Sequence, residues 1–230
     1  MGLVSLKTIL WEVDVQADFM LPGGSLYIAG AETIVANINL LVDCARKNRV
    51  FLISSADAHN PNDLEFRDWP PHCLQGTPGA ALLPEACASP RLLIPNKKGF
   101  AVPQDFLPYR QVTLEKNSLD VFDNPNTESI LARMKPACLP DVQSGLLFVV
   151  FGVATEYCVR RTAEGLLRRG YSVAIVNDAV RAIDEDKGRH ILEDLRFSGT
   201  QLISTKEALA VLTDRQNEHS NFVRSAKLNP

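Results

Sequence analysis

Residues 148–159 decide the fold, and they read Phe148-Val149-Val150-Phe151-Gly152-Val153-Ala154-Thr155-Glu156-Tyr157-Cys158-Val159. The first half is a continuous apolar run, which is typical of a strand that is buried on both faces. Gly152 and Ala154 permit a tight turn, and helical spacing of apolar residues follows as far as Gly170. We therefore expect Cys158 at the first turn of a helix, where free backbone N–H groups favour the thiolate. The alternative is a small buried residue that falls on the turn.

Composition excludes several classes of protein. The chain has 230 residues, of which 46% are hydrophobic, so we expect one domain over residues 1–212 and a polar tail over 213–230. A net charge of -3 gives no reason to expect nucleic acid or a membrane as partner, and no apolar stretch could span a bilayer. The five cysteines are scattered, without a C-x-x-C pair, which favours a reducing cytoplasm over a disulfide framework.

Strand-like and helix-like segments alternate along the rest of the chain. Besides the central strand, apolar runs predict strands at residues 8–13, 50–53, 111–115, 171–176 and 201–203. Amphipathic spacing or capping residues predict helices at 34–45, 126–135, after Asp184, and from Ser204 to Leu212, whereas residues 80–110 give no clear pattern. This alternation implies a mostly parallel sheet with helices on both faces and ligands at the carboxyl ends of the strands. No glycine-rich phosphate loop follows the first strand, which argues against a dinucleotide enzyme.

Three polar residues at these strand ends suit nucleophilic catalysis. Asp14 ends the first strand, Lys116 ends the third, and Cys158 follows the central one. A carboxylate beside the thiol can take its proton, and a lysine beside both stabilises the thiolate and orients the carboxylate. Taken singly, such an aspartate is more often a turn residue and such a lysine is more often solvated.

A metal site is the second candidate. Asp57-x-His59 places two ligands on one side of an extended segment, and His72 can close the site from a long loop. One carboxylate and two imidazoles suit zinc, iron or manganese, and Glu65 or Asp63 can add a further ligand. The alternative is that Asp57 and His59 are turn residues and that His72 is a surface histidine.

Several motifs in a fixed order carry a family resemblance. They are Val13-Asp14-Val15-Gln16-Ala17-Asp18-Phe19, Asp57-Ala58-His59, Trp69-Pro70-Pro71-His72-Cys73-Leu74-Gln75-Gly76-Thr77, Lys116, and Gly152-Val153-Ala154-Thr155-Glu156-Tyr157-Cys158-Val159. Together they resemble the isochorismatase-like cysteine hydrolases, and the two histidine-containing segments resemble the nicotinamidase/pyrazinamidase branch. The resemblance spans the chain from about Ile9 to Leu212. It implies a three-layer α/β/α fold with a mostly parallel, six-stranded sheet.

The resemblance also implies a role for each matching residue. The implied catalytic triad is Asp14, Lys116 and Cys158. The implied ligands of a divalent metal, zinc before iron or manganese, are Asp57, His59 and His72. The implied aromatic walls of the substrate pocket are Phe19 and Trp69. A cis peptide before Ala154 is implied to turn the N–H groups of Ala154 and Cys158 into an oxyanion hole.

Two segments depart from the nicotinamidase pattern. Glu65 stands where many nicotinamidases have a further histidine, so the metal can differ. Lys116-Asn117-Ser118-Leu119-Asp120-Val121-Phe122 looks more like the general cysteine-hydrolase pattern, which leaves the exact amide open. Isochorismatase itself has no cysteine at the nucleophile position, so Cys158 argues against vinyl-ether hydrolysis.

The resemblance implies a metal-assisted cysteine amidohydrolase that converts nicotinamide to nicotinate and ammonia through a thioester. The metal would bind the pyridine nitrogen and position the ring. The alternatives are hydrolysis of another small amide, such as an N-carbamoyl, ureido or other heteroaromatic compound, and a catalytically silent binding protein. The expected partners are a small amide substrate and further copies of the chain, since relatives are often dimers or tetramers.

Overall fold

The computed structural model describes residues 7–106, 108–134 and 145–212. Within them, seven parallel strands form one sheet in the order β3-β4-β2-β1-β5-β6-β7. The strands are β1 (Lys7–Val13), β2 (Phe51–Asp57), β3 (Arg91–Ile94), β4 (Gln111–Lys116), β5 (Leu146–Val153), β6 (Ser172–Arg181) and β7 (Gln201–Ile203). The predicted three-layer α/β fold with a mostly parallel sheet is confirmed, but the predicted number of six strands is wrong.

The additional strand is β3, which lies within residues 80–110, where no clear pattern of apolar residues predicts an element. It is four residues long and forms an edge of the sheet beside β4. Arg91 and Leu93 are exposed, and only Ile94 is buried. An edge strand of this kind lacks the continuous apolar run by which the central strands are recognised.

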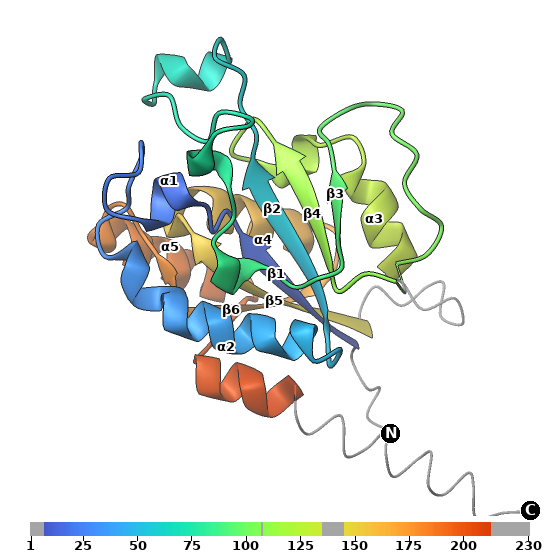
Figure 1. The fold of residues 1–230 in the computed structure, drawn as a ribbon. Helices are drawn as coiled ribbons and strands as arrows, with labels where there is room; N and C mark the ends of the chain where they lie inside the picture. The colour runs from blue at the N-terminus through green and yellow to red at the C-terminus, as the bar shows by residue number, and fades with distance from the viewer. Residues whose placement is uncertain (1–6, 107, 135–144, 213–230) are drawn as a thin grey trace, which may run out of the picture.

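Helices cover both faces of the sheet (Figure 1). One face packs against α2 (Val35–Arg46) and the helical residues 205–212, and the other packs against α3 (Thr127–Met134), α4 (Arg160–Arg168) and α5 (Glu185–Phe197). The strand β5 contributes alternate side chains to both cores, Val149 and Phe151 to the first and Phe148 and Val150 to the second. All eight of its residues are buried, as the apolar run predicts.

The predicted helix starts are confirmed where they can be checked. Asp184 accepts hydrogen bonds from two N–H groups in the first turn of α5. Ser204 N–H donates to Glu207 Oε2 at 2.7 Å, and Glu207 N–H donates back to Ser204 Oγ at 3.3 Å. His190 is exposed on α5. The predicted end of the helix at residue 135 and the predicted tail 213–230 lie outside the described residues. Among the described residues, no helix is long and apolar enough to cross a membrane.

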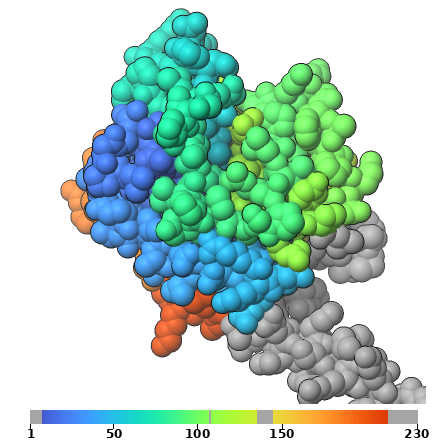
Figure 2. All heavy atoms as spheres, in the orientation of Figure 1, coloured from blue at the N-terminus to red at the C-terminus, as the bar shows by residue number. Residues whose placement is uncertain are grey.

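The strand order reverses at β1, because β2 and β4 lie on one side of it and β5 and β6 on the other. A crevice at such a point, at the carboxyl ends of the strands, is the usual ligand site of a parallel α/β sheet. A long connection between β2 and β3 stands over this end of the sheet, in turquoise and green in Figures 1 and 2. It carries only single turns, namely η2 (Leu64–Arg67), η3 (Pro78–Ala80) and η4 (Pro84–Ala86). Turns of similar length elsewhere are α1 (Ala17–Met20), η1 (Ala31–Ile34) and η5 (Val121–Asp123).

Candidate active site

The ends of three strands bring Asp14, Lys116 and Cys158 together. Lys116 Nζ lies 2.9 Å from Asp14 Oδ2 and 3.5 Å from Cys158 Sγ. Asp14 and Lys116 are each 1% exposed, and Cys158 is 6% exposed. The three residues predicted as a triad therefore form one buried group, in which an amine lies between a carboxylate and a thiol.

Burial is the largest single influence on the pKa of each of these three groups, but it does not decide the direction for Lys116. It raises the pKa of Cys158 well above its usual range, although Lys116 acts in the opposite direction. This opposes the expectation that the start of a helix favours the thiolate, so the sulfur must lose its proton to a neighbour before it can attack. Burial also raises the pKa of Asp14, while Lys116 lowers it. Burial by itself lowers the pKa of Lys116, but Asp14 and Asp57 hold it well above its usual value.

Cys158 is presented by an irregular turn. It lies in a π-helical turn, Thr155–Val159, between β5 and α4, and such turns occur often at functional sites. A Cβ atom on Gly152 would lie 2.1 Å from Val13 O, and the φ of Gly152 is +117°, so only glycine lets β5 end against β1 here. The peptide between Val153 and Ala154 is cis, as the resemblance implies.

Asp14 is presented by a second irregular turn. Its φ is +53°, in the left-handed region, where a residue other than glycine loses about 1–2 kcal/mol. Asp14 N–H donates to Ser55 O at 3.2 Å, and Ser55 Oγ donates to Asp14 Oδ1 at 2.7 Å. The neighbouring strand β2 thus fixes both the backbone and the carboxylate of Asp14.

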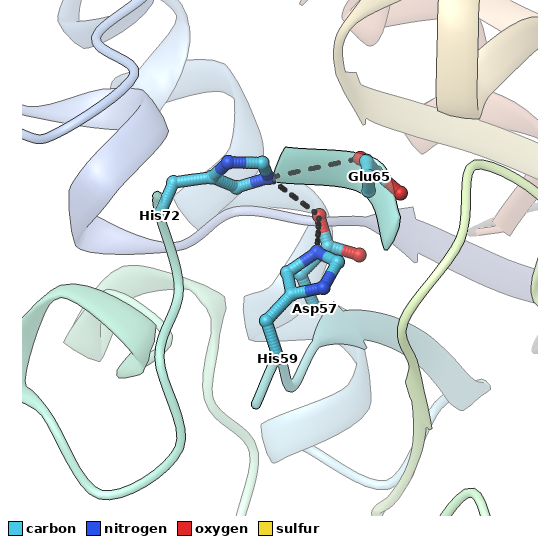
Figure 3. Close-up of side chains that lie close together, drawn as sticks. All are labelled: Asp57, His59, Glu65 and His72. Carbon is cyan, nitrogen blue, oxygen red and sulfur yellow. Dashed lines mark ion pairs between the residues drawn. The ribbon is translucent and has the colours of Figure 1, made fainter. Parts of the chain in front are cut away.

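Four side chains form a cluster beside the triad (Figure 3). One ligand atom from each of Asp57, His59, Glu65 and His72 lies within 4.8 Å of the others. Asp57 Oδ2 is 3.8 Å from His59 Nε2 and 3.6 Å from His72 Nε2. Glu65 Oε1 is 3.8 Å from His72 Nε2. Two ligands of one ion, each bound at about 2.0–2.2 Å, lie about 3–4 Å apart, so these separations suit a shared metal ion.

The surroundings of the two histidines also fit a metal. His59 Nε2 is buried without a hydrogen-bond partner. The other nitrogen of each ring is held from outside, His59 Nδ1 by Asp63 Oδ2 at 3.1 Å and His72 Nδ1 by the carbonyl of Pro70 at 2.8 Å. Such outer contacts fix the tautomer that leaves Nε2 free to bind a metal. Glu65 therefore joins the predicted ligands, whereas Asp63 lies behind His59 and orients it.

Asp57 belongs to both groups. It accepts a short hydrogen bond from Lys116 Nζ through Oδ1, while Oδ2 faces the two histidines. This follows from the pairing of β2 with β4, which sets Asp57 directly opposite Lys116. Burial opposes ionisation of Asp57, but Lys116 and the histidines together hold its pKa below the usual range. The spacing of residues along the sequence does not reveal this shared carboxylate.

A pocket of about 350 Å³ connects the two groups. The predicted aromatic residues Phe19 and Trp69 line it together with Asp14, Asp57, Glu65, His72, Ala154 and Cys158. Sequence reasoning missed the remaining lining residues, which are Leu26, Ile28, Leu119, Val153, Tyr157 and Ile183. Trp69 packs edge-on against Tyr157, with ring centroids 5.2 Å apart. Of the missed residues, only Tyr157 carries a usable signal, since it precedes the cysteine in the chain.

Two further side chains that sequence reasoning missed hold the segments around the pocket. Gln16 is buried, accepts from Asp57 N–H at 2.7 Å and donates to Asp57 O at 2.8 Å. Glu156 accepts from the N–H groups of Ile183 and Asp184 at 3.3 and 2.8 Å. Gln16 therefore supports a ligand of the metal cluster, and Glu156 supports a wall of the pocket.

Comparison with known proteins agrees with this geometry. Residues 8–207 match the family model described as the isochorismatase domain. The nicotinamidase of Acinetobacter baylyi is 28% identical over 86% of this chain and 92% of its own length, and the nicotinamidase/pyrazinamidase of Mycobacterium tuberculosis is 27% identical over 83% and 95%. The crystal structure of the pyrazinamidase of Pyrococcus horikoshii in complex with zinc is 26% identical, with a TM-score of 0.66 over 86% of this chain and 99% of that one. The chain therefore belongs to the isochorismatase-like hydrolases, in their nicotinamidase/pyrazinamidase branch.

Proposed function

We propose that this protein is a cysteine amidohydrolase that converts nicotinamide to nicotinate and ammonia through a thioester. The observation that carries the proposal is the position of Lys116 Nζ, which contacts both Asp14 and Cys158, two residues that line the pocket. The same amine contacts Asp57 of the metal cluster, so nucleophile, base and ligand set share one small site. The nicotinamidase names of the relatives in Acinetobacter baylyi and Mycobacterium tuberculosis support this choice of amide.

The first half of the reaction forms the thioester. Asp14 accepts the proton of the Cys158 thiol, and the thiolate attacks the carbonyl carbon of the amide. Lys116 stays charged and stabilises the thiolate while it forms. The N–H groups of Ala154 and Cys158 hold the negative oxygen of the tetrahedral intermediate, which is worth about 3–4 kcal/mol in comparable sites. Asp14 then returns its proton to the departing amine, which leaves as ammonia when the carbon–nitrogen bond breaks.

The second half consumes water. Asp14 takes a proton from a water molecule, and the resulting hydroxide attacks the thioester carbonyl. Breakage of the carbon–sulfur bond releases the carboxylic acid, and the proton returns to sulfur. A carboxylate whose pKa is raised by burial is suited to this cycle, because it must hold a proton in each half.

Asp57, His59, His72 and Glu65 would hold the divalent metal, for which the imidazole and carboxylate set favours zinc over iron or manganese. When bound, the metal supplies a Lewis acid that can fix a ring nitrogen of a heteroaromatic amide. Phe19 and Trp69 flank the same pocket, so they can enclose a flat ring and limit its orientations.

The proposal extends to the organisation of the chain. Residues 1–212 are taken as one hydrolase domain with 213–230 as a tail, and the working form as a cytoplasmic homo-oligomer, a dimer or a tetramer. Limited proteolysis that leaves residues 1–212 intact would support the first point. Light scattering of the purified full-length chain tests the second, and a monomer at enzymatic concentrations would contradict it.

A panel of amides tests the activity. Purified protein loaded with zinc, iron or manganese is given nicotinamide, other heteroaromatic amides, N-carbamoyl amino acids and ureido acids, and released ammonia is measured. We expect kcat/KM for nicotinamide to exceed that for the N-carbamoyl and ureido compounds by at least about 100-fold. Preference for one of the latter would reassign the substrate. If no amide is hydrolysed and the Cys158 thiol is no more reactive than an ordinary cysteine, a catalytically silent binding protein would be favoured.

A further inference from the structure

Glu12 is a buried acid in β1, two residues before Asp14, and it lies between the apolar residues Trp11 and Val13. Its side chain is 0% exposed. Glu12 Oε1 accepts from Val15 N–H at 3.0 Å, and Glu12 Oε2 accepts from Ser54 Oγ at 2.8 Å. A carboxyl group is costly to bury even when it is hydrogen-bonded, so an aliphatic residue would suit the strand better if packing were its only role.

A network of buried side chains holds this carboxyl group. Gln111 Nε2 donates to Ser54 Oγ at 2.6 Å and to Ala86 O at 2.9 Å, and Gln111 Oε1 accepts from Ala88 N–H at 2.7 Å. Ser54 and Gln111 are each 0% exposed. The network thus crosses from β4 through β2 to β1, and its last hydrogen bond ends on the backbone of Val15.

That backbone N–H comes directly after the left-handed residue Asp14. The bond from Val15 N–H to the side chain three residues earlier closes a turn around Asp14, and Gln16 N–H closes it further by donating to Asp14 O at 2.8 Å. Without the carboxyl group, Val15 N–H would be buried with no side-chain acceptor, and the strained backbone could relax. We propose that Glu12 is a positioning residue for Asp14, whose carboxyl group holds the turn that aims the Asp14 carboxylate at Lys116 and Cys158.

The acceptor oxygen, and not the charge, carries this role. Burial raises the pKa of Glu12 to about 8, while the bonds from Ser54 and Val15 lower it, so both protonation states are populated near neutral pH. Either state offers an oxygen to Val15 N–H. Glutamine at this position keeps that oxygen and the volume of the side chain, and it should therefore preserve the turn.

Four proteins test the inference: the wild type, Glu12→Ala, Glu12→Gln, and Leu10→Ala as the matched control. Leu10 lies on the same strand and is also 0% exposed, but its side chain has no oxygen that could accept a hydrogen bond from the turn. Glu12→Ala should lower kcat for nicotinamide by about 10-fold to 100-fold with KM within about twofold, because the base is displaced. Glu12→Gln should stay within about threefold of the wild type. Leu10→Ala should lose stability without loss of kcat in the folded protein.

The kcat measurement rests on the proposed function, so a second readout is independent of the substrate. Burial raises the pKa of Cys158, Lys116 lowers it and the carboxylate of Asp14 raises it further, so displacement of that carboxylate should speed alkylation of Cys158 by iodoacetamide at neutral pH. We expect Glu12→Ala to react about threefold faster or more than Leu10→Ala, as followed by mass spectrometry of the peptide that contains Cys158. If the wild type hydrolyses no amide, the proposed function is wrong. The rate of Cys158 alkylation then still tests the role of Glu12.

The inference would be overturned if Glu12→Ala kept the kcat and the alkylation rate of the wild type. It would also be overturned if Glu12→Ala and Glu12→Gln lowered kcat by the same factor. If Glu12→Ala does not fold, Ser54→Ala takes its place, since it removes the partner that orients the carboxyl group and leaves Glu12 itself. Ser54→Ala should then lower kcat by about threefold to 10-fold with unchanged KM. A Ser54→Ala protein with wild-type kcat would also overturn the inference.

Discussion

The triad and the metal cluster share Asp57, but they are held in different ways. Each member of the triad lies at the end of a central strand or in the turn after it, and none is more than 6% exposed. In the metal cluster, Glu65 and His72 come from the long connection after β2. The turn η2, which carries Glu65, has no buried residue. One region is therefore fixed by the sheet, and the other depends on a surface segment.

Because of this difference, the triad and the metal cluster should depend on different interactions for their geometry. Register between strands fixes the triad, since Val13 lies opposite Ser55 on one side and Gly152 on the other. The long connection is instead held to the rest of the molecule by hydrogen bonds at scattered points, such as Cys73 N–H to Asp18 Oδ2 at 2.7 Å and Leu83 N–H to Val15 O at 2.9 Å. We expect the sheet to preform the triad without metal and the metal to order the cluster.

The largest effect should come from the nucleophile. Cys158→Ala should lower kcat for amide hydrolysis by at least about 10⁴-fold, because no other group in the pocket can form the thioester. Metal affinity and melting temperature should stay close to those of the wild type, since Cys158 is not one of the four residues proposed to hold the metal. Ammonia release, metal titration and thermal unfolding measure these three quantities, and Cys87→Ala, which changes a half-buried cysteine outside the pocket, is the control. Turnover by Cys158→Ala would refute the nucleophile assignment.

The second-largest effect should involve both regions at once, because Lys116 contacts Asp14 and Cys158 of the triad and Asp57 of the metal cluster. Lys116→Met removes the cation that lies between the buried carboxylates of Asp14 and Asp57. We expect kcat to fall by about 10³-fold and the free energy of unfolding to fall by about 3–5 kcal/mol. Urea unfolding and ammonia release measure the two losses. A protein with full stability and reduced kcat would show that Lys116 acts in catalysis alone.

Much of the sheet-held region could be predicted from the sequence. Apolar runs locate β1, β2, β4 and β5, and a parallel sheet gathers the residues after them at one edge, which brings Asp14, Lys116 and Cys158 together. The strand β3 could not be found in this way, since its four residues are mostly exposed at an edge. The contact of Asp57 with Lys116 depends on the register of β2 against β4, and no local pattern encodes that register.

The loop-held region was less predictable. Asp57, His59 and His72 stand in recognisable motifs, but spacing alone could not choose between Asp63 and Glu65 as the additional ligand. The structure places Glu65 in the cluster and Asp63 behind His59, because the single turn η2 directs the two side chains differently. Pocket walls such as Leu26 and Ile183 come from loops without periodicity and meet only in the folded chain.

A third, smaller effect should be confined to the metal cluster. Asp63→Ala removes the acceptor that orients the ring of His59, and outer contacts of this kind are worth about 10-fold to 100-fold in metal affinity. We therefore expect zinc affinity to fall by that factor, measured with a competing chelator. The rate of Cys158 alkylation in metal-free protein should not change, and Asp68→Ala, an exposed aspartate nearby, should change neither. Faster or slower alkylation in Asp63→Ala would mean that the two regions are not independent.

The last effect concerns the dependence of stability on pH that follows from burying an acid in the sheet-held region. Burial raises the pKa of Glu12 from an ordinary value of 4.5 to about 8, Asp14 raises it slightly, and Arg91 lowers it. Because the folded state holds this proton more tightly than the unfolded state, its contribution to stability is complete below pH 4.5 and is lost as the pH rises through 8. The expected slope is about 1.4 kcal/mol per pH unit, or about tenfold in the folding equilibrium. Urea unfolding of the wild type and Glu12→Gln across this range, both in chelator, isolates the slope because the histidines titrate alike in the two proteins. Parallel stability curves for the two proteins would show that Glu12 titrates normally and that the sheet carries no such cost.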